Sequence, residues 1–293
     1  AITLGCSINY LAVATNLNYL RIFTLGGLQY KMMLLDGKAI NITTSNDNNV
    51  FAITYDVNGS LFMEVIDMDT STSIFDGKIA LTSNEATLIR VFVSKKMIYI
   101  IDSNNILSLL KKDFNKFRWI PVLNINNALD IKYSTKKDIK PNHAWPVYYD
   151  NETNELIVIE LNSLSEPIVS SESPIFTAYN LNPPLLNNGT SSYYDLETQI
   201  FNDNILHNSA INDDKKYKKE LLKNYLKLFQ NACELKRPVL AYDIALHKLI
   251  TQKALTNSSK IAMHMNYSKL AQNINALLTK KYSNNNNNNN NYS

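Results

Sequence analysis

The sequence predicts a β-propeller of the WD type followed by a small all-α five-helix bundle. Short strand-like runs separated by turn residues recur until about residue 176, at a spacing near the roughly 40–45 residues of a propeller blade. A stretch rich in Ser, Pro, Asn and Gly follows, and from residue 191 the apolar spacing becomes helical. We therefore predict a propeller over 1–179, a linker over 180–191, a helical bundle over 192–282 and a disordered Asn-rich tail over 283–293.

Blade-like units begin near residues 1, 38, 86 and 143. In the first unit, strand-like segments 10–15 and 19–23 flank Asn16-Leu17-Asn18, and asparagine tolerates the positive φ that tight turns require. In the second unit, two more strand-like segments flank Asn58-Gly59, which is a strong hairpin signal. The remaining predicted strands are 29–35, 50–55, 61–66, 88–93, 97–101, 106–110, 145–149, 155–160 and 174–179.

These units amount to about four blades. Closed propellers with four blades exist. The chain nevertheless enters strand-like sequence directly at Ala1, so we expect that one or two blades precede it. Closure of the ring matters because it removes exposed strand edges that promote aggregation.

Five helices are predicted after the linker. Ser191-Ser192 can cap the first, which runs to about residue 207, and Asp213-Asp214 suit the positive end of the second. Pro238 fits the first turn of the third helix. The second, fourth and fifth helices are expected at about 213–234, 253–265 and 268–280.

Composition excludes several classes of protein. The 29 basic and 26 acidic residues leave a net charge of only +3, which argues against a dedicated DNA-binding surface and leaves room for no more than a weak local DNA contact. Cys6 and Cys233 are far apart in sequence, which indicates a reducing compartment and no disulfide framework. No apolar run reaches the ~18 residues that a membrane span needs.

No set of residues indicates catalysis or metal binding. The four histidines, at 143, 207, 247 and 264, do not pair with another His or Cys at metal-ligand spacing. Cys233 lies on an apolar helical stripe, which favours a buried structural thiol over a nucleophile. A Gly-rich phosphate loop and a Gly-x-Ser-x-Gly elbow are absent from the sequence. We therefore predict a protein that is not an enzyme and binds no cofactor.

Several stretches resemble the motifs of one family, in the same order. They are VATNLNYLRIF (13–23), DSNNILSLL (102–110), RWIPVL (118–123), HAWPV (143–147) and LKLFQNAC (226–233). On these motifs the chain, from about residue 9 to 280, resembles the carboxy-terminal half of the chromosome transmission fidelity factor, also called the acidic nucleoplasmic DNA-binding protein family.

The resemblance implies a specific assembly. Family members form a homotrimer through six-bladed propellers, and their helical bundles offer a groove to short amphipathic helices of replication partners. These partners include a GINS subunit and the catalytic subunit of DNA polymerase α, with other replication and cohesion factors. The resemblance therefore implies a nuclear, non-enzymatic scaffold at the replication fork that supports sister-chromatid cohesion.

The local match assigns the groove to four residues on two helices. Leu226 and Gln230 lie one turn apart on one helix, and Asn257 and Ile261 lie one turn apart on another. An amphipathic helix needs small or aliphatic residues at such positions. Leu226 and Ile261 suit that role, or else they belong to the ordinary bundle core. Gln230 and Asn257 are polar where the yeast pattern has small apolar residues.

Other functions are less well supported by the sequence. A scaffold of a vesicle coat or nuclear pore complex also joins a propeller to helices, but usually to a long solenoid rather than a short bundle. An enzyme that uses the propeller channel would need converging carboxylates or metal ligands. A direct nucleic-acid role would give binding with a steep salt dependence.

Overall fold

The computed structural model divides the chain into two compact units, Ala1–Pro184 and Leu185–Ser293. It describes residues 3–282 except 46–47, 95, 114–115, 135–140, 151–152, 154, 162–175, 183–191 and 208–214. Some predicted features lie outside the described residues: the start of the strand at 174–179, most of the linker, Asp213, Asp214 and the Asn-rich tail.

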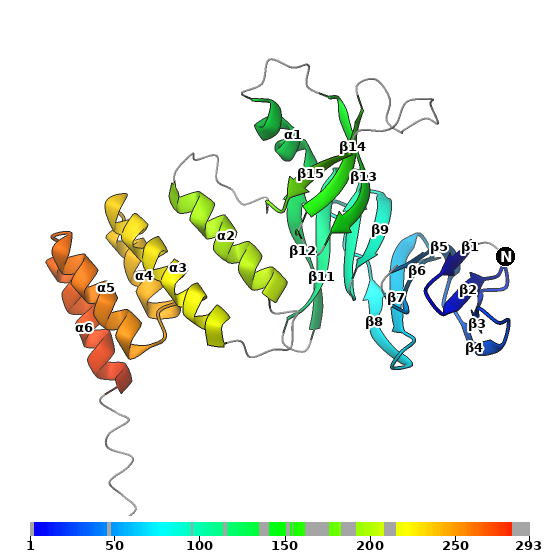
Figure 1. The fold of residues 1–293 in the computed structure, drawn as a ribbon, viewed down its shortest axis with the longest axis horizontal. Helices are drawn as coiled ribbons and strands as arrows, with labels where there is room; N and C mark the ends of the chain where they lie inside the picture. The colour runs from blue at the N-terminus through cyan, green and yellow to red at the C-terminus, as the bar shows by residue number, and fades with distance from the viewer. Residues whose placement is uncertain are drawn as a thin grey trace, which may run out of the picture. The chain divides into compact units, whose positions relative to one another are not determined.

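In the first unit, the described strands form four antiparallel sheets in which consecutive strands are neighbours (Figure 1). The first sheet comprises β1 (Thr3–Cys6), β2 (Tyr10–Ala14), β3 (Tyr19–Thr24) and β4 (Gln29–Leu34). The second comprises β5 (Lys38–Thr44), β6 (Val50–Val57), β7 (Ser60–Asp67) and β8 (Thr72–Lys78). The third comprises β9 (Leu88–Ser94), β10 (Met97–Asp102), β11 (Ile106–Asp113) and β12 (Lys116–Asn124). The fourth comprises β13 (His143–Asp150), β14 (Glu155–Leu161) and β15 (Phe176–Asn180). These sheets confirm the prediction of propeller blades.

Turn chemistry sets the hairpins locally. Val57 pairs with Ser60, so β6 and β7 are joined by Asn58 and Gly59 alone. Both turn residues have positive φ, 52° and 81°. A two-residue turn of this kind matches the twist of the strands that it joins, which is why the Asn-Gly signal is readable in the sequence.

The sheets pack on one another through apolar faces, with an ion pair and a hydrogen bond between neighbouring sheets. Side chains buried between the first and second sheets include Ala12, Leu20, Ile22, Phe51 and Ile53, and those between the second and third include Val50, Met63, Val91 and Ile100. At the second interface, the Lys96 Nζ lies 2.7 Å from a carboxylate oxygen of the buried Asp67. Between the third and fourth sheets, Arg90 Nη1 donates to the Pro146 carbonyl at 3.0 Å.

One face of the first sheet has no covering sheet among the described residues. The register places Met32 opposite Arg21 and Leu34 opposite Tyr19. Leu4, Met32 and Leu34 are 61%, 52% and 68% exposed, whereas the other face of this sheet is buried against the second sheet. The unit therefore presents an apolar sheet face as well as a buried core.

Several elements of the first unit are absent from the predicted strands and helices, among them β5, β8, β12 and α1. β5 and β8 carry many polar residues, and the pattern of β8 is mostly exposed, so neither strand shows a clear apolar alternation. The helix α1 (Ile125–Tyr133) follows β12 in the sequence, over residues to which the prediction assigned no element. Its start is set by Asn124, whose side chain accepts from the Asn127 N–H at 3.1 Å.

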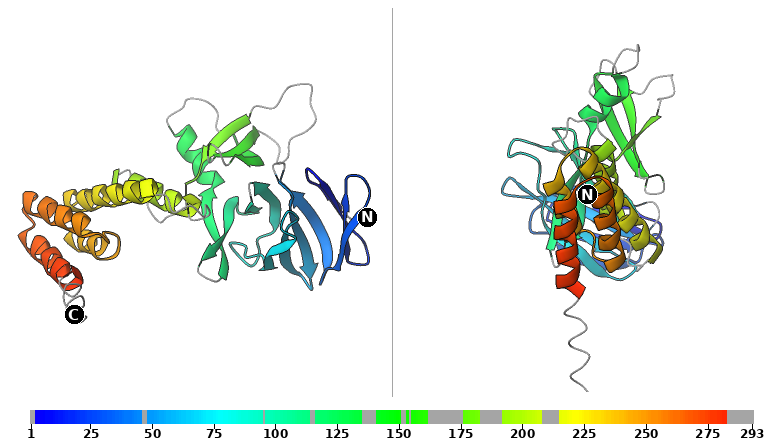
Figure 2. Two further views of the ribbon diagram at one scale, coloured as in Figure 1. Left: turned by 60° about the horizontal axis from the view of Figure 1, so that its bottom comes forward. Right: turned by 90° about the vertical axis from the view of Figure 1, so that its left-hand side faces the viewer.

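The described residues of the second unit form five helices, which confirms the predicted bundle (Figure 2). They are α2 (Ser192–His207), α3 (Lys215–Glu234), α4 (Pro238–His247), α5 (Gln252–His264) and α6 (Ser268–Tyr282). Their fully buried side chains include Phe229, Ala241, Ala245, Leu255 and Ile274. None of the described helices combines the length and apolar character needed to cross a bilayer.

The turns after α3 and α5 use left-handed residues that are not glycine. Lys236 has φ 57°, and its N–H donates to the Cys233 carbonyl at 2.9 Å. The Arg237 N–H donates to the Ala232 carbonyl, which completes a Schellman motif. Asn266 has φ 66° and ends α5 in the same way.

Replacing Lys236 by glycine is expected to raise the free energy of unfolding of the helical unit by about 0.5–1 kcal/mol. A side chain in the left-handed region costs free energy that glycine does not. Urea unfolding followed by circular dichroism at 222 nm would measure the change. The matched control is Lys260→Gly inside α5, which should lower stability by about 1 kcal/mol. A loss of stability in K236G would contradict this explanation of the turn.

Candidate functional site

The structure places the four predicted groove residues on two helices in contact, α3 and α5. Leu226 and Ile261 are half-buried, and both pack against the core of the bundle. Gln230 is exposed, and its Nε2 donates to Glu234 Oε1 at 3.0 Å. Asn257 is half-buried. Leu226 and Ile261 therefore support the core and also keep part of their surface accessible.

Four exposed lysines accompany these residues on the same two helices. Lys223 precedes Leu226 by three positions and Lys227 precedes Gln230 by three, so each lies on the neighbouring turn of α3. Lys253 and Lys260 hold similar positions around Asn257 on α5. The ion pairs found among the described residues involve none of these four lysines. The α3–α5 pair thus carries unneutralised positive charge around its apolar positions.

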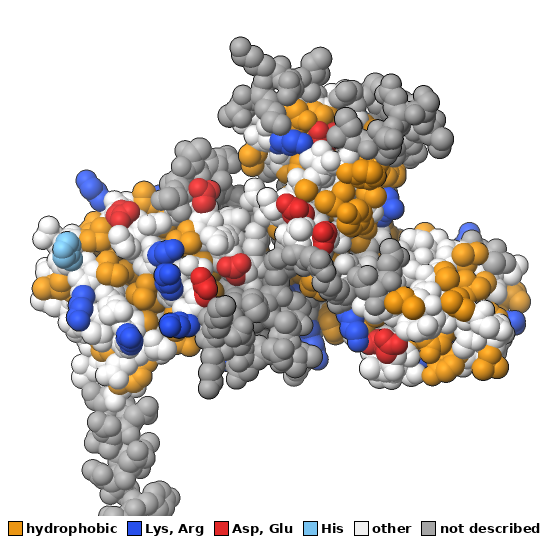
Figure 3. Space-filling view, viewed as in Figure 1, with side chains coloured by type: hydrophobic (Ala, Val, Ile, Leu, Met, Phe, Trp, Pro, Cys, Tyr) orange, Lys and Arg blue, Asp and Glu red, His pale blue; other side chains and the backbone are white. Residues whose placement is uncertain are grey.

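These lysines are part of an uneven distribution of charge along the chain, which the overall net charge of +3 does not show. Residues 215–282 contain 14 Lys and Arg but only three Asp and Glu, a net charge of +11. Residues 1–214 contain 15 basic and 23 acidic residues, a net charge of −8. Figure 3 shows Lys and Arg side chains over much of the helical unit. Counting charge by segment would have revealed this signal in the sequence.

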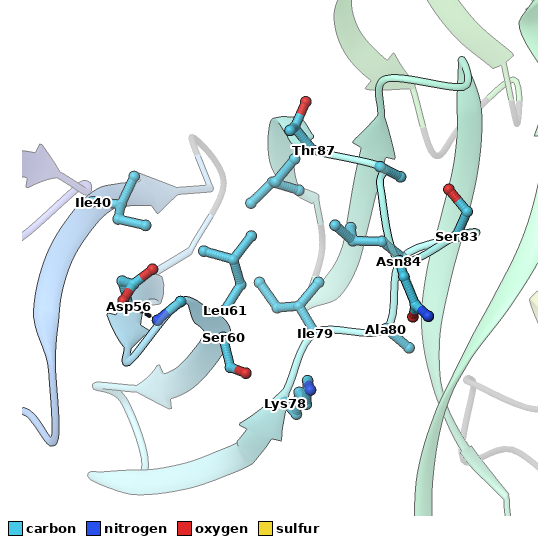
Figure 4. Close-up of a pocket in the computed structure, with 14 residues that line it drawn as sticks. Ile40, Asp56, Ser60, Leu61, Lys78, Ile79, Ala80, Ser83, Asn84 and Thr87 are labelled. Atoms are coloured by element: carbon cyan, nitrogen blue, oxygen red, sulfur yellow. Dashed lines mark hydrogen bonds between the residues drawn. The ribbon is translucent and has the colours of Figure 1, made fainter.

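The propeller unit has a separate cavity of about 690 Å³ beside the second sheet (Figure 4). Ile40, Leu61 and Ile79 supply apolar walls, and the segment that leads into β9 supplies several polar groups. Asp56 lines it, but its Oδ1 already accepts from the Gly59 N–H at 2.9 Å. Of the described residues that line the cavity, Lys78 is the other charged one. The hydroxyl groups of the cavity, on Ser60, Ser83 and Thr87, have no histidine with them among the described lining residues to act as a base.

One carboxylate of the first unit accepts hydrogen bonds from two different elements, the helix α1 and the strand β15. Glu160 of β14 accepts from the Lys132 Nζ at 2.7 Å, the Tyr133 hydroxyl at 2.6 Å and the Tyr179 hydroxyl at 2.7 Å. Burial acts to raise the pKa of Glu160, but these hydrogen bonds outweigh it, so the pKa lies below the ordinary value of glutamate. The cluster ties α1 to the fourth sheet.

Cys233 is a buried thiol, as predicted. It is 1% exposed, and burial together with the nearby Glu234 raises the pKa of its thiol to about 11. The thiol is therefore protonated at neutral pH and is a poor nucleophile. Among the described residues, no group of three or more His, Cys, Asp and Glu side chains is placed to hold a metal ion.

Comparison with known families gives two matches that together span most of the chain. The family model described as "Minichromosome loss protein, Mcl1, middle region" matches residues 1–185. The family model described as "DNA polymerase alpha-binding protein Ctf4, C-terminal domain" matches residues 193–284. No curated protein matches the chain.

Solved structures give distant matches. The crystal structure of HIRA(644-1017) is 11% identical, with a TM-score of 0.44, over 93% of this chain and 79% of that one. Hsv2 of Kluyveromyces lactis is 13% identical, with a TM-score of 0.33, over 54% of this chain and 41% of that one. The chain thus spans less than half of the Hsv2 structure.

Proposed function

The chain belongs to the Ctf4 and Mcl1 family of DNA polymerase alpha-binding replication factors, and on that basis we propose that it is a non-enzymatic homotrimeric scaffold of the eukaryotic replisome. It links a GINS subunit of the replicative helicase to the catalytic subunit of DNA polymerase α by binding short helical peptides of both. The observation that carries this proposal is the match of residues 193–284 to the C-terminal domain of a polymerase alpha-binding protein.

The geometry of the bundle supports helical peptides as ligands. An amphipathic helix binds to a pair of helices through apolar anchors at successive turns. Leu226 and Ile261 offer such contacts from two adjacent helices, with Gln230 and Asn257 one turn away. The lysines of α3 and α5 favour a peptide that carries acidic residues beside its apolar face.

Trimer formation would compensate for weak individual sites. A single shallow groove binds weakly, but three grooves on one assembly raise the effective concentration of partners that are tethered to it. We place this assembly in the nucleus at the replication fork, where it also serves other replication factors and sister-chromatid cohesion.

Two measurements test the proposal. Light scattering coupled to gel filtration, at micromolar concentration, should give a mass of about 100 kDa for three 33.3 kDa chains. Overlapping 20-residue peptides from the polymerase α catalytic subunit and GINS subunits of the same organism should include micromolar binders, read by fluorescence anisotropy. A monomeric mass would refute the trimer, and the absence of any binder at 100 µM would refute peptide docking.

A further inference from the structure

The helical unit contains a second concave site, distinct from the α3–α5 residues. It is a pocket of about 420 Å³ between the start of α4 and the start of α6. Its walls are formed mainly by Pro238, Val239, Tyr242, Tyr267, Lys269 and Leu270. None of the four groove residues lines it, so occupation of one site does not by itself block the other.

The pocket is apolar and accessible. Val239 is 75% exposed, although it is a large aliphatic residue, and Leu235, just before the pocket in sequence, is 41% exposed. The Tyr267 hydroxyl donates to the Cys233 carbonyl at 3.0 Å, which holds this wall in place. Pockets lined by hydrophobic and aromatic side chains with a few polar groups are typical ligand sites. This volume suits one or two large apolar side chains.

Positive charge borders the pocket. Lys269 lines it, and the exposed Lys236 and Arg237 immediately precede Pro238. The first turns of α4 and α6 both contribute to the wall, so the positive ends of two helix dipoles reach it. No side chain caps the start of α4.

Two carboxylates lie near this region in sequence. Glu234 accepts from Gln230, and Asp243 lies one turn after Val239 on α4. Together with Lys236, Arg237 and Lys269 they leave a local excess of positive charge. The net charge of +11 over residues 215–282 extends this excess across the helices around the pocket.

We infer that this pocket binds a short acidic peptide of a partner protein, with one large apolar side chain seated against Val239 and a carboxylate beside Lys269. Charge complementarity favours an acidic ligand. The apolar walls favour a peptide over a nucleic acid, because a phosphate backbone would leave the exposed side chains of Pro238 and Val239 without apolar contacts. The inference does not depend on the α3–α5 groove.

The consequence is a helical unit with two docking sites. A partner held in this pocket and a helix held against α3 and α5 would contact different residues of the same chain. The scaffold could therefore hold two clients per chain, and a partner with both kinds of motif would gain affinity through effective concentration.

The test uses the full chain and an acidic probe, the fluorescein-labelled peptide Asp-Glu-Asp-Leu-Phe-Asp-Glu-Asp. Val239→Glu and Lys269→Glu should each weaken its binding at least fivefold in fluorescence anisotropy. Val239 is exposed enough for the first change to leave the fold intact, and circular dichroism checks this. The matched controls Met263→Glu, at a 58% exposed apolar residue of α5, and Lys280→Glu, at an exposed lysine near the other end of α6, should change binding by less than twofold.

Three outcomes would overturn the inference. Equal losses in the pocket and control variants would mean attraction by diffuse charge. Loss of binding in Leu226→Glu, with none in Val239→Glu, would place the peptide on the α3–α5 surface. Preferential binding of a 20-nucleotide oligothymidine through Val239 and Lys269 would make the pocket a nucleic-acid contact. If polymerase α and GINS peptides do not bind the α3–α5 groove, the expected result with this probe stays the same. The groove proposal and the pocket proposal can therefore be refuted separately.

Discussion

Replacing Leu226 by glutamate is expected to weaken binding of a polymerase α-derived helical peptide about 30-fold or more. Apolar anchors at the centre of an interface commonly contribute 2 kcal/mol or more, and 1.4 kcal/mol corresponds to tenfold in affinity. The variant removes an apolar contact on α3 and adds a negative charge that repels an acidic peptide. Ile261→Glu should have a similar effect from α5, measured by anisotropy with the tightest peptide of the overlapping set.

Controls separate lost docking from lost folding. Leu226 and Ile261 also pack against the bundle core, so each variant needs a thermal unfolding curve. Leu226→Ala provides a milder version, and Met263→Glu provides the same charge change at an exposed apolar residue elsewhere on α5. Unchanged affinity in both folded glutamate variants would mean that the peptide binds elsewhere on the protein.

Replacing Glu160 by alanine is expected to lower the free energy of unfolding of the propeller unit by about 2–3 kcal/mol. Removing one partner of a largely buried charged cluster leaves the other groups without compensation, which typically costs about 3–5 kcal/mol. The Glu160 side chain keeps 12% exposure and Lys132 keeps 26%, so some solvation remains and the estimate is reduced. Urea unfolding followed by tryptophan fluorescence would measure it.

The same cluster predicts a pH dependence with a defined sign. The pKa of Glu160 is lower in the folded protein than in the unfolded chain, so the unfolded state binds the proton more readily. The stabilisation is therefore fully present above the unfolded pKa of glutamate, about 4.3, and is lost as the pH falls through the folded pKa. Wild type should lose stability over this acidic range, and Glu160→Ala should lose less.

A neighbouring carboxylate provides the control. Glu155→Ala, on the same strand, lacks the three hydrogen bonds of Glu160 and should change stability by less than about 1 kcal/mol. Equal destabilisation by both variants, or an identical acid response in Glu160→Ala and wild type, would refute the structural role of the cluster.

Features set by adjacent residues were predictable from the sequence. The Asn58-Gly59 hairpin needs only residues that tolerate positive φ, and the structure has both of them at positive φ. The bundle helices show as apolar stripes because one face of each must be buried. β8 and α1 were missed because β8 is a mostly exposed strand and α1 is a short helix begun by an Asn side chain. Their stability depends on neighbours that are distant in sequence.

The candidate site could be predicted from the sequence only in part. Leu226, Gln230, Asn257 and Ile261 came from a family resemblance, and their role in binding remains a prediction. The positive charge around them can be counted from the sequence. The overall net charge of +3 does not reveal it, because residues 1–214 carry an excess of acidic residues. The α4–α6 pocket has no sequence signal, since it brings together residues about 30 positions apart.

The sequence by itself determined the blade hairpins, the bundle helices and the family, because each depends on local backbone preference, apolar periodicity or short motifs. Only the tertiary structure decided that Glu160 ties α1 to the fourth sheet, that α3 and α5 lie side by side, and that two helix starts enclose an apolar pocket. Contacts of this kind form when packing buries surfaces from distant parts of the chain, and no local pattern encodes which surfaces will meet.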